Sequence, residues 1–329
     1  MAAVSHRWQY SDRHFVGDEE QKYRQQEGSE VINDVHLIDI SVSYAITKRF
    51  TATLAIPFQF ATRSQAIRDN RRVNGQLVNP SPFPAPDGVP RGAVIDRYET
   101  SAYGLSDMRL LGTAWLLDPE HNKKQNISVG LGVLFPTGEK DAKDTFRVFA
   151  TNSAGAYDPR AEERNVDNSI QPGGGAWGVI FDIYMFWEPL EDLNLFASGT
   201  YIAVPAEDAG VFDGPNDTGN VWSTADSYLF RAGAGYTFHP GYVDGLTLTL
   251  NGRMEGTPST DMFGDSEGRR RPGFAISIEP GLVATKNGWF GSFSAPVALY
   301  RNRERNFENE EGDAAFADFM TLLTVGYRF

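Results

Sequence analysis

The end of the chain alternates between apolar and polar or small side chains with a period of two. One side of the segment 319–329 carries Phe319, Leu323, Val325, Tyr327 and Phe329, and the other carries Thr324, Gly326 and Arg328. A period of two is that of a β-strand, because successive side chains point to opposite faces. The segment is therefore predicted to be a strand with one apolar, aromatic-tipped face that ends on a phenylalanine.

The same alternation recurs along the whole chain. The clearest case is 127–135, where Ile127, Val129 and Leu131 oppose Ser128 and Gly130. Apolar alternation of this kind predicts twelve strands, at about 4–10, 36–46, 50–60, 103–117, 127–135, 177–187, 193–204, 228–238, 246–254, 274–282, 289–301 and 319–329.

The connections between these strands alternate in length. Short links at 47–49, 118–125, 189–192, 239–245 and 285–288 alternate with long ones at about 15–34, 62–102, 137–174, 205–226, 257–272 and 302–314. Transmembrane barrels have short periplasmic turns, long external loops and an even number of strands. The sequence thus predicts an all-β fold in which residues 1–329 form one transmembrane antiparallel β-barrel domain, with both termini on the short-turn side and the last strand closing the barrel.

Composition agrees with this class of protein. Mean hydropathy is −0.37 and no run of eighteen apolar residues occurs, which excludes a helical membrane protein. A barrel strand needs only every second residue to be apolar. The net charge of −13 argues against a nucleic-acid partner. The chain starts without an apolar signal core, so location in the bacterial outer membrane requires that a signal peptide has been removed.

A soluble β-sandwich is the alternative, because its strands also alternate. The polar faces here carry many glycines and serines with isolated charges, as a crowded lumen would. Aromatic residues such as Trp177 and Trp187 lie near strand ends, as in the aromatic girdles of membrane barrels. These features favour the membrane barrel.

Catalytic and cofactor motifs are not found in the sequence. It has no nucleophile-elbow pattern, no phosphate-binding glycine loop and no pair of histidines at metal-ligand spacing. We therefore expect neither an enzyme nor a protein with a metal or another cofactor.

Charged residues on the inward faces of the predicted strands are the candidate functional positions. They are Asp39, Asp107, Arg109, Asp182, Arg231, Arg253, Glu255, Glu279 and Arg328. Opposed charges of this kind form either a polar transport path or a salt-bridged network that braces a narrow barrel. Twelve strands enclose a small lumen that one folded-in loop could block.

Two internal segments carry a more specific resemblance. The stretch 103–110 contains Gly104 and Asp107 in a Gly-x-x-Asp pattern, and a following strand ends Leu-x-Pro-Thr-Gly at 134–138. Together with 173–177, the strand containing Pro296 and the C-terminal strand, this resembles the outer-membrane barrels of the MetA-pathway phenol-degradation or transporter-like family over about 100–329. Ser106 departs from the Gly or Asp expected there. The resemblance implies a channel or transporter-like barrel that passes small, often hydrophobic or aromatic, compounds, and it transfers no site residues.

These observations predict a passive channel for small molecules. The alternative is a closed structural or interaction barrel that anchors a partner in the outer membrane. The expected partners are outer-membrane lipid and lipopolysaccharide, the barrel-assembly machinery through the C-terminal strand, and a protein that binds the external loops; nucleic acid is not expected.

Overall fold

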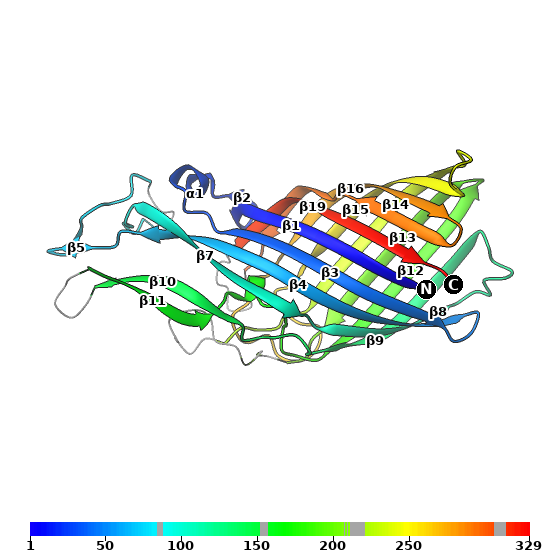
Figure 1. Cartoon of the computed structure of the whole chain (residues 1–329), viewed down its shortest axis with the longest axis horizontal. Coiled ribbons are helices and arrows are strands. Elements are labelled where there is room, and N and C mark those ends of the chain that lie inside the picture. Colours follow the sequence, from blue (N-terminus) through cyan, green and yellow to red (C-terminus); the bar gives the residue numbers. More distant parts are fainter. Residues whose placement is uncertain (84–87, 152–156, 207, 209, 211–220, 306–313) are drawn as a thin grey trace.

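Twelve antiparallel strands close into a barrel in the computed structural model (Figure 1). The structure describes residues 1–83, 88–151, 157–206, 208, 210, 221–305 and 314–329. Parts of the predicted loops 62–102, 137–174, 205–226 and 302–314 therefore lie outside the described residues. Both termini lie at the end of the barrel that carries the short turns, which is the periplasmic end in this class.

The strands follow one another around the barrel in chain order. Their bounds are β1 (Ala2–Val16), β3 (Ile32–Ala45), β4 (Phe50–Arg68), β7 (Val94–Leu105), β8 (Met108–Trp115), β9 (Gln125–Phe135), β12 (Gly178–Leu190), β13 (Leu193–Ala203), β14 (Ser227–Phe238), β15 (Gly245–Thr257), β16 (Gly273–Lys286), β17 (Trp289–Ser294), β18 (Val297–Arg303) and β19 (Ala314–Tyr327).

Two of the twelve predicted strands are interrupted. The one expected at 103–117 is split into β7 and β8, which both pair with β4. The one expected at 289–301 is split into β17 and β18, which both pair with β16 and β19. Pro296 lies in the second break, where its missing N–H prevents regular pairing. When β7 with β8 and β17 with β18 are each counted as one strand of the barrel, the number of strands is twelve, as predicted.

The first and last strands form the closing seam. β1 pairs with β19 from Ala2 opposite Tyr327 to Phe15 opposite Ala314. The hydroxyls of Ser5 and Thr324 lie 2.9 Å apart across this seam on the inner face. Closure pairs the edge strands, which is what allows a sheet to span a bilayer. The prediction that the C-terminal segment is the closing strand is confirmed.

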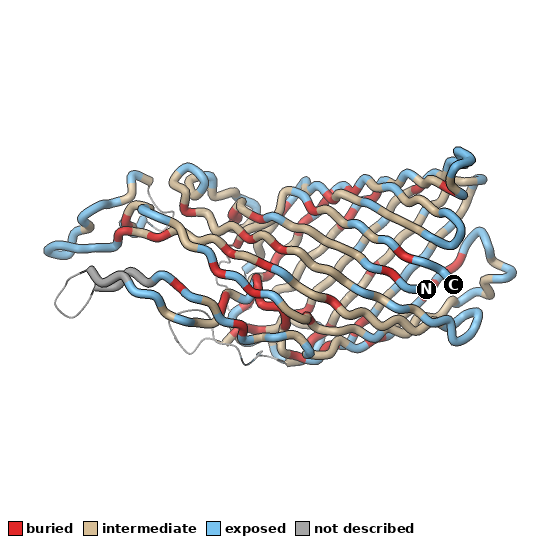
Figure 2. The backbone as a smooth tube through the Cα atoms, in the orientation of Figure 1, coloured by how far each residue is buried: buried red, intermediate tan, exposed pale blue. Residues whose placement is uncertain are grey.

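The outer face of the barrel is an apolar belt. Large apolar side chains are exposed all around it, among them Leu131 at 61%, Leu299 at 67% and Phe329 at 81%. The row Phe319, Leu323, Val325, Tyr327 belongs to this belt. Figure 2 shows the buried positions concentrated toward the external half. An apolar surface this large would not remain dispersed in water, and it matches the lipid-facing band of an outer-membrane barrel.

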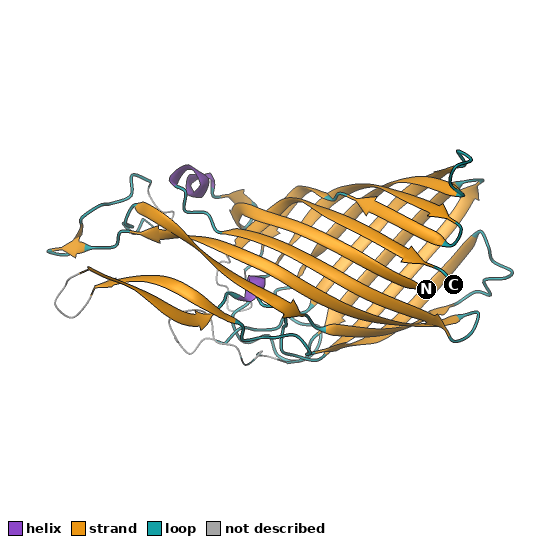
Figure 3. Cartoon of the chain, viewed as in Figure 1, coloured by secondary structure: helices purple, strands orange, loops and turns teal. Residues whose placement is uncertain are grey.

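The remaining elements lie at the end opposite the termini (Figure 3). They are β2 (Glu19–Glu20), α1 (Lys22–Glu27), β5 (Arg72–Val73), β6 (Gln76–Leu77), β10 (Lys143–Thr151), β11 (Tyr157–Asn165) and η1 (Asn168–Ile170). β4 and β7 continue outward into the segment 62–102 that was expected as loop, and β10 and β11 form a hairpin within 137–174. In the described part of the chain, neither helix is long and apolar enough to cross a membrane.

Candidate functional site

Small residues make room for charged side chains on the inner wall. A Cβ on Gly130 would lie 2.9 Å from the Cβ of Asp182, and one on Gly233 would lie 2.3 Å from Oδ1 of Asn251. Real Cβ atoms do not approach so closely, so these inward positions accept only glycine without rearrangement. The alternation of the strands thus supplies an oily outside and a crowded polar inside.

Charged side chains from six strands meet in the lumen. We call this group the lumen charge cluster, and it consists of Arg7, Asp39, Arg109, Arg231, Arg253, Glu255 and Glu279. Six of its seven members are among the nine inward charges expected from the sequence.

Three of the arginines in the cluster are paired with carboxylates. Arg109 forms an ion pair with Asp39, which lies on β3. Nη2 of Arg253 lies 2.6 Å from Oε2 of Glu255, its neighbour on the same face of β15. The first pair joins two strands and the second joins residues two apart on one strand, and in both pairs the side chains point to the inner face.

Glu279, on β16, lies close to two of these arginines, Arg253 on the adjacent β15 and Arg231 on β14. Its side chain is 2% exposed, and Oε2 lies 3.2 Å from Nε of Arg231 and 3.6 Å from Nη1 of Arg253. The hydroxyl of Ser294 donates a hydrogen bond of 2.8 Å to its Oε1. A carboxylate this deeply buried must be paired, so Glu279 braces the inner wall of β14 to β17.

The other three expected charges lie elsewhere. Asp182 accepts a hydrogen bond of 2.8 Å from the hydroxyl of Thr200. Arg328 follows the end of β19 at the periplasmic rim, with its guanidinium carbon 5.6 Å from the ring centre of Phe290.

Asp107 holds loop backbone at the barrel mouth. It lies in the break between β7 and β8, and its two carboxylate oxygens accept hydrogen bonds from the backbone N–H groups of Gly138 and Gly174, at 2.9 and 2.7 Å. A Cβ on Gly173 would lie 2.5 Å from the backbone of Gly138, so two chain segments cross there in van der Waals contact. Asp107 therefore anchors the segment 137–174.

Arg7 is the cluster member absent from the expected set. It lies on β1, at the strand predicted from the sequence at about 4–10. The same period of two places Arg7 inward. Within the described residues it makes no hydrogen bond or ion pair through its side chain, and its Nε is buried without a partner.

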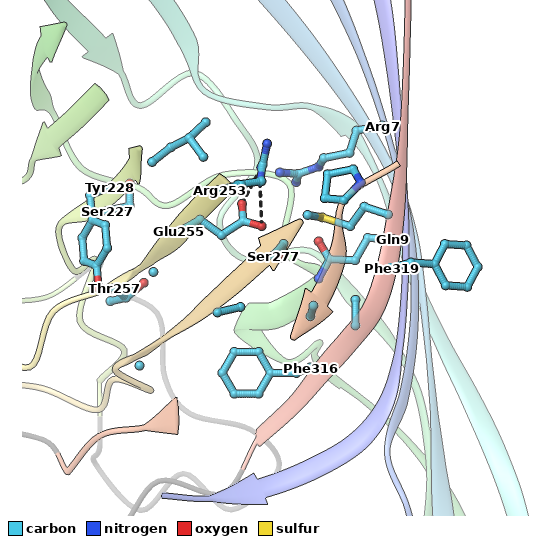
Figure 4. A pocket seen from close by; sticks show the side chains of 18 of the residues that line it. Arg7, Gln9, Ser227, Tyr228, Arg253, Glu255, Thr257, Ser277, Phe316 and Phe319 are labelled. Carbon is cyan, nitrogen blue, oxygen red and sulfur yellow. Dashed lines mark hydrogen bonds and ion pairs between the residues drawn. The ribbon is translucent and has the colours of Figure 1, made fainter. Parts of the chain in front are cut away.

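A cavity of about 460 Å³ lies against the cluster (Figure 4). Arg7 and Gln9 reach it from β1, Arg253 and Glu255 from β15, and Tyr228 from β14. Figure 4 shows Phe316 on the cavity side of β19, whereas Phe319 points away to the outer face.

A second cavity, of about 510 Å³, lies toward the external end. Its wall contains Trp222, which is 2% exposed. The guanidinium carbons of Arg269 and Arg271 lie 5.1 and 4.7 Å from the centre of its ring. The two cavities share Thr257, Arg303 and Ala315 in their walls, so they adjoin one another.

Part of the segment 137–174 folds into the mouth of the barrel. Val166 and Ile170 are fully buried and pack in one cluster with inward residues of the wall, namely Val35, Ala61 and Ala102. The side-chain amide of Gln59, from the inner face of β4, donates hydrogen bonds to the carbonyls of Ile170 and Gln171 at 2.9 and 3.0 Å. The folded-in loop narrows the external half of the lumen.

Asp167, just before η1, joins this inserted segment to the wall. Its Oδ1 lies 2.9 Å from Nη1 of Arg271, and its Oδ2 lies 3.4 Å from Nη2 of Arg63. Burial alone would raise the pKa of Asp167, but the two guanidiniums outweigh it and hold that pKa well below its usual range. The carboxylate is thus charged at any physiological pH.

Comparisons with known proteins connect this architecture to solved barrels. No protein-family model and no curated protein matches the chain. Among solved structures, the COG4313 outer membrane channel from Pseudomonas putida F1 is 13% identical with a TM-score of 0.55, covering 100% of this chain and 94% of that one. The CymD monoaromatic hydrocarbon channel is 12% identical with a TM-score of 0.48, covering 100% and 88%. The Ralstonia pickettii toluene transporter TbuX is 12% identical with a TM-score of 0.47, covering 100% and 89%. At 13% identity, the likeness to the COG4313 channel shows a shared fold, and the chain is an outer-membrane β-barrel.

Proposed function

We propose that this barrel is a passive outer-membrane channel for small molecules and that its lumen is the route. The two adjoining cavities carry this proposal, because together they extend from the external mouth to the lumen charge cluster. A barrel that served only as a structural element could fill this space with side chains, as the smallest barrels do. The likeness in fold to an outer membrane channel supports the same function.

The inward charges have two roles in this proposal. Glu279 and the arginines beside it brace the wall, and the same side chains give a passing solute a polar surface with both signs of charge. Asp182 lines the route next to Thr200, a wall residue of the inner cavity. Substitution of these charged residues is therefore expected to change the conductance of the channel.

Small hydrophobic or aromatic molecules are the solutes we propose. Trp115, Tyr184 and Phe186 form an aromatic cluster, with the ring centre of Trp115 6.2 Å from that of Tyr184 and 5.9 Å from that of Phe186. Their positions share the inward parity of Arg109 and Asp182, so the rings line the periplasmic half of the lumen. Aromatic faces provide favourable contacts for a planar solute.

Planar-bilayer recording of the purified barrel tests the channel. Discrete openings are expected, and Asp182→Asn or Arg231→Gln should change their conductance. A barrel that stays silent where a known porin conducts would contradict the proposal.

A closed barrel that anchors a partner is the second candidate, and the insertion of Val166 and Ile170 into the mouth favours it. It predicts a stoichiometric protein partner after purification in mild detergent, together with no swelling of liposomes that contain the barrel.

A further inference from the structure

We propose that the lumen binds small organic anions and that Arg7 is the residue that holds their carboxylate. This inference rests on the proposed channel function and specifies its substrate class. It starts from the charge balance of the lumen charge cluster, in which four arginines face three carboxylates. Arg7 is the arginine left over.

The charges around Arg7 explain why it stays available. Glu255 and Asp39 attract it, while Arg253 and Arg109 repel it. Each of the two carboxylates is already engaged by its own arginine, Glu255 by Arg253 at 2.6 Å and Asp39 by Arg109. Glu279 is likewise committed to Arg231 and Arg253. Asp318 also lines this cavity, and it is engaged by Arg13 at 2.7 Å and by Arg301. The described part of the wall thus offers Arg7 no carboxylate of its own.

Arg7 also points into space that a ligand can occupy. It lines the cavity of about 460 Å³, whose size falls in the range of small-molecule sites. Gln9 and Ser277 supply polar side chains around it, and Tyr228 and Phe316 supply aromatic surface at the other side (Figure 4). A guanidinium with an unmet donor, facing both polar groups and rings, fits a carboxylate attached to an aromatic or short apolar body.

The external cavity, through which a solute would enter, is positively charged, as Arg7 is. Six arginines line the external cavity, and none of its described wall residues is acidic: Arg24, Arg63, Arg269, Arg270, Arg271 and Arg303. Two carboxylates outside this wall pair with three of them, Asp167 with Arg63 and Arg271 and Asp261 with Arg270, so six arginines stand against two carboxylates. The net charge of the whole chain is −13, so this concentration of arginines at one cavity is opposite to the overall composition. A cavity with walls of one sign attracts counter-charged solutes.

The two cavities place the external arginines and Arg7 one after the other along the lumen. A carboxylate that enters among the mouth arginines passes the shared wall at Thr257, Arg303 and Ala315 and reaches Arg7. Below Arg7 the route continues past the aromatic cluster of Trp115 and Tyr184. A solute thus meets the arginines first and the aromatic rings second, and this order suits an aromatic molecule with a single negative charge.

Two measurements on the full chain test this inference, with benzoate as the probe and benzyl alcohol as its neutral counterpart. Isothermal titration calorimetry of the detergent-solubilised barrel measures binding without requiring conduction. We expect benzoate to bind and benzyl alcohol to bind at least tenfold more weakly. Arg7→Gln should weaken benzoate binding by about tenfold or more, because a hydrogen bond to a charged group is lost. Arg7→Lys should retain part of the affinity, because it keeps the charge but loses the planar fork.

Reversal potentials in a KCl gradient give the second readout. Wild-type barrels should prefer chloride over potassium, and Arg7→Gln should reduce that preference severalfold. Arg49→Gln is the matched control, because it removes one arginine from the short turn 47–49 outside both cavities. Arg7→Gln leaves no carboxylate newly unpaired, and heat-modifiable migration on gels verifies that the variant folds.

The outcomes separate this inference from the channel proposal. Wild-type barrels that conduct but bind no benzoate, or an Arg7→Gln variant that binds it like wild type, would overturn the anion site. A preference for potassium in the wild type would also overturn it. A barrel that never conducts but binds benzoate through Arg7 would refute the channel and leave the site.

Discussion

Arg270 and Asp261 form a fully buried ion pair in an external loop. Nη2 of Arg270 lies 2.7 Å from Oδ2 of Asp261, and the two side chains are 1% and 0% exposed. The same guanidinium donates a hydrogen bond of 2.6 Å to the hydroxyl of Ser223. Asp261 Oδ1 also accepts the backbone N–H of Asp226. The pair therefore fixes the loop 257–272 to the neighbouring connection and shapes the external cavity.

Asp261→Ala should loosen the loop 257–272 without unfolding the barrel. Removing one partner of a buried pair leaves the arginine uncompensated, which costs about 3–5 kcal/mol. Limited proteolysis should cut 257–272 much faster than in wild type, while heat-modifiable migration stays unchanged. Asp265→Asn, at an exposed position of the same loop, is the control and should behave like wild type.

Glu279→Gln should increase the positive charge of the lumen. Arg231 and Arg253 would then face each other without their shared carboxylate, at a cost of about 3–5 kcal/mol. The midpoint of urea unfolding in liposomes should fall, and the reversal potential should move further toward chloride. An unchanged midpoint would show that Glu279 is not the brace.

Glu27 makes the external end sensitive to acid. Its carboxylate accepts two hydrogen bonds from Arg68 and one from Ser81. The hydrogen bond with Arg68, helped by that from Ser81, lowers the pKa of Glu27 from 4.5 to about 2. Because the folded pKa is depressed, the stabilisation is complete above pH 4.5 and is lost as the pH falls toward 2. Its size is about 3 kcal/mol.

Hydrogen exchange of α1 and the outer part of β4 should therefore accelerate between these two pH values. Glu27→Gln should exchange faster at neutral pH and lose this dependence. If hydrogen exchange in Glu27→Gln accelerated as much as in wild type when the pH falls, groups other than Glu27 would be responsible for the acid sensitivity.

The alternation of side chains was sufficient to predict the barrel, because each lipid-facing row must be apolar whatever its neighbours are. It also placed six members of the lumen charge cluster. Arg7 has the same inward parity on the strand predicted at about 4–10, but the nine predicted inward charges did not include it. The insertion around Ile170 could not be predicted, since it depends on contacts with Gln59 and Ala61 that are distant in sequence. The role of Asp107 as a loop anchor was hidden for the same reason.

Charged substitutions on the outer belt should be costly in proportion to depth. Leu250 lies near the middle of β15 and is 55% exposed, whereas Val325 lies close to the periplasmic end of β19. Leu250→Arg should destabilise the folded barrel by about 2–4 kcal/mol and Val325→Arg by about 0–1 kcal/mol. Urea titration in liposomes, read by heat-modifiable migration, measures both. Equal costs at the two positions would contradict the placement of Leu250 near the middle of the apolar belt and of Val325 near its periplasmic edge.

Gln59→Leu should release the inserted segment and widen the channel. The substitution leaves the carbonyls of Ile170 and Gln171 without their donor, and each unmet buried group costs about 1–3 kcal/mol. Because the chain has no native cysteine, Ile170→Cys supplies a unique label site that is buried while the segment is docked.

In the Ile170→Cys background, Gln59→Leu should speed labelling by an impermeant thiol reagent and raise single-channel conductance together. Gln65→Leu, further along the same face of β4, should change neither. Faster labelling with unchanged conductance would mean that the inserted segment does not limit flow, and the constriction would then have to lie deeper, at the lumen charge cluster.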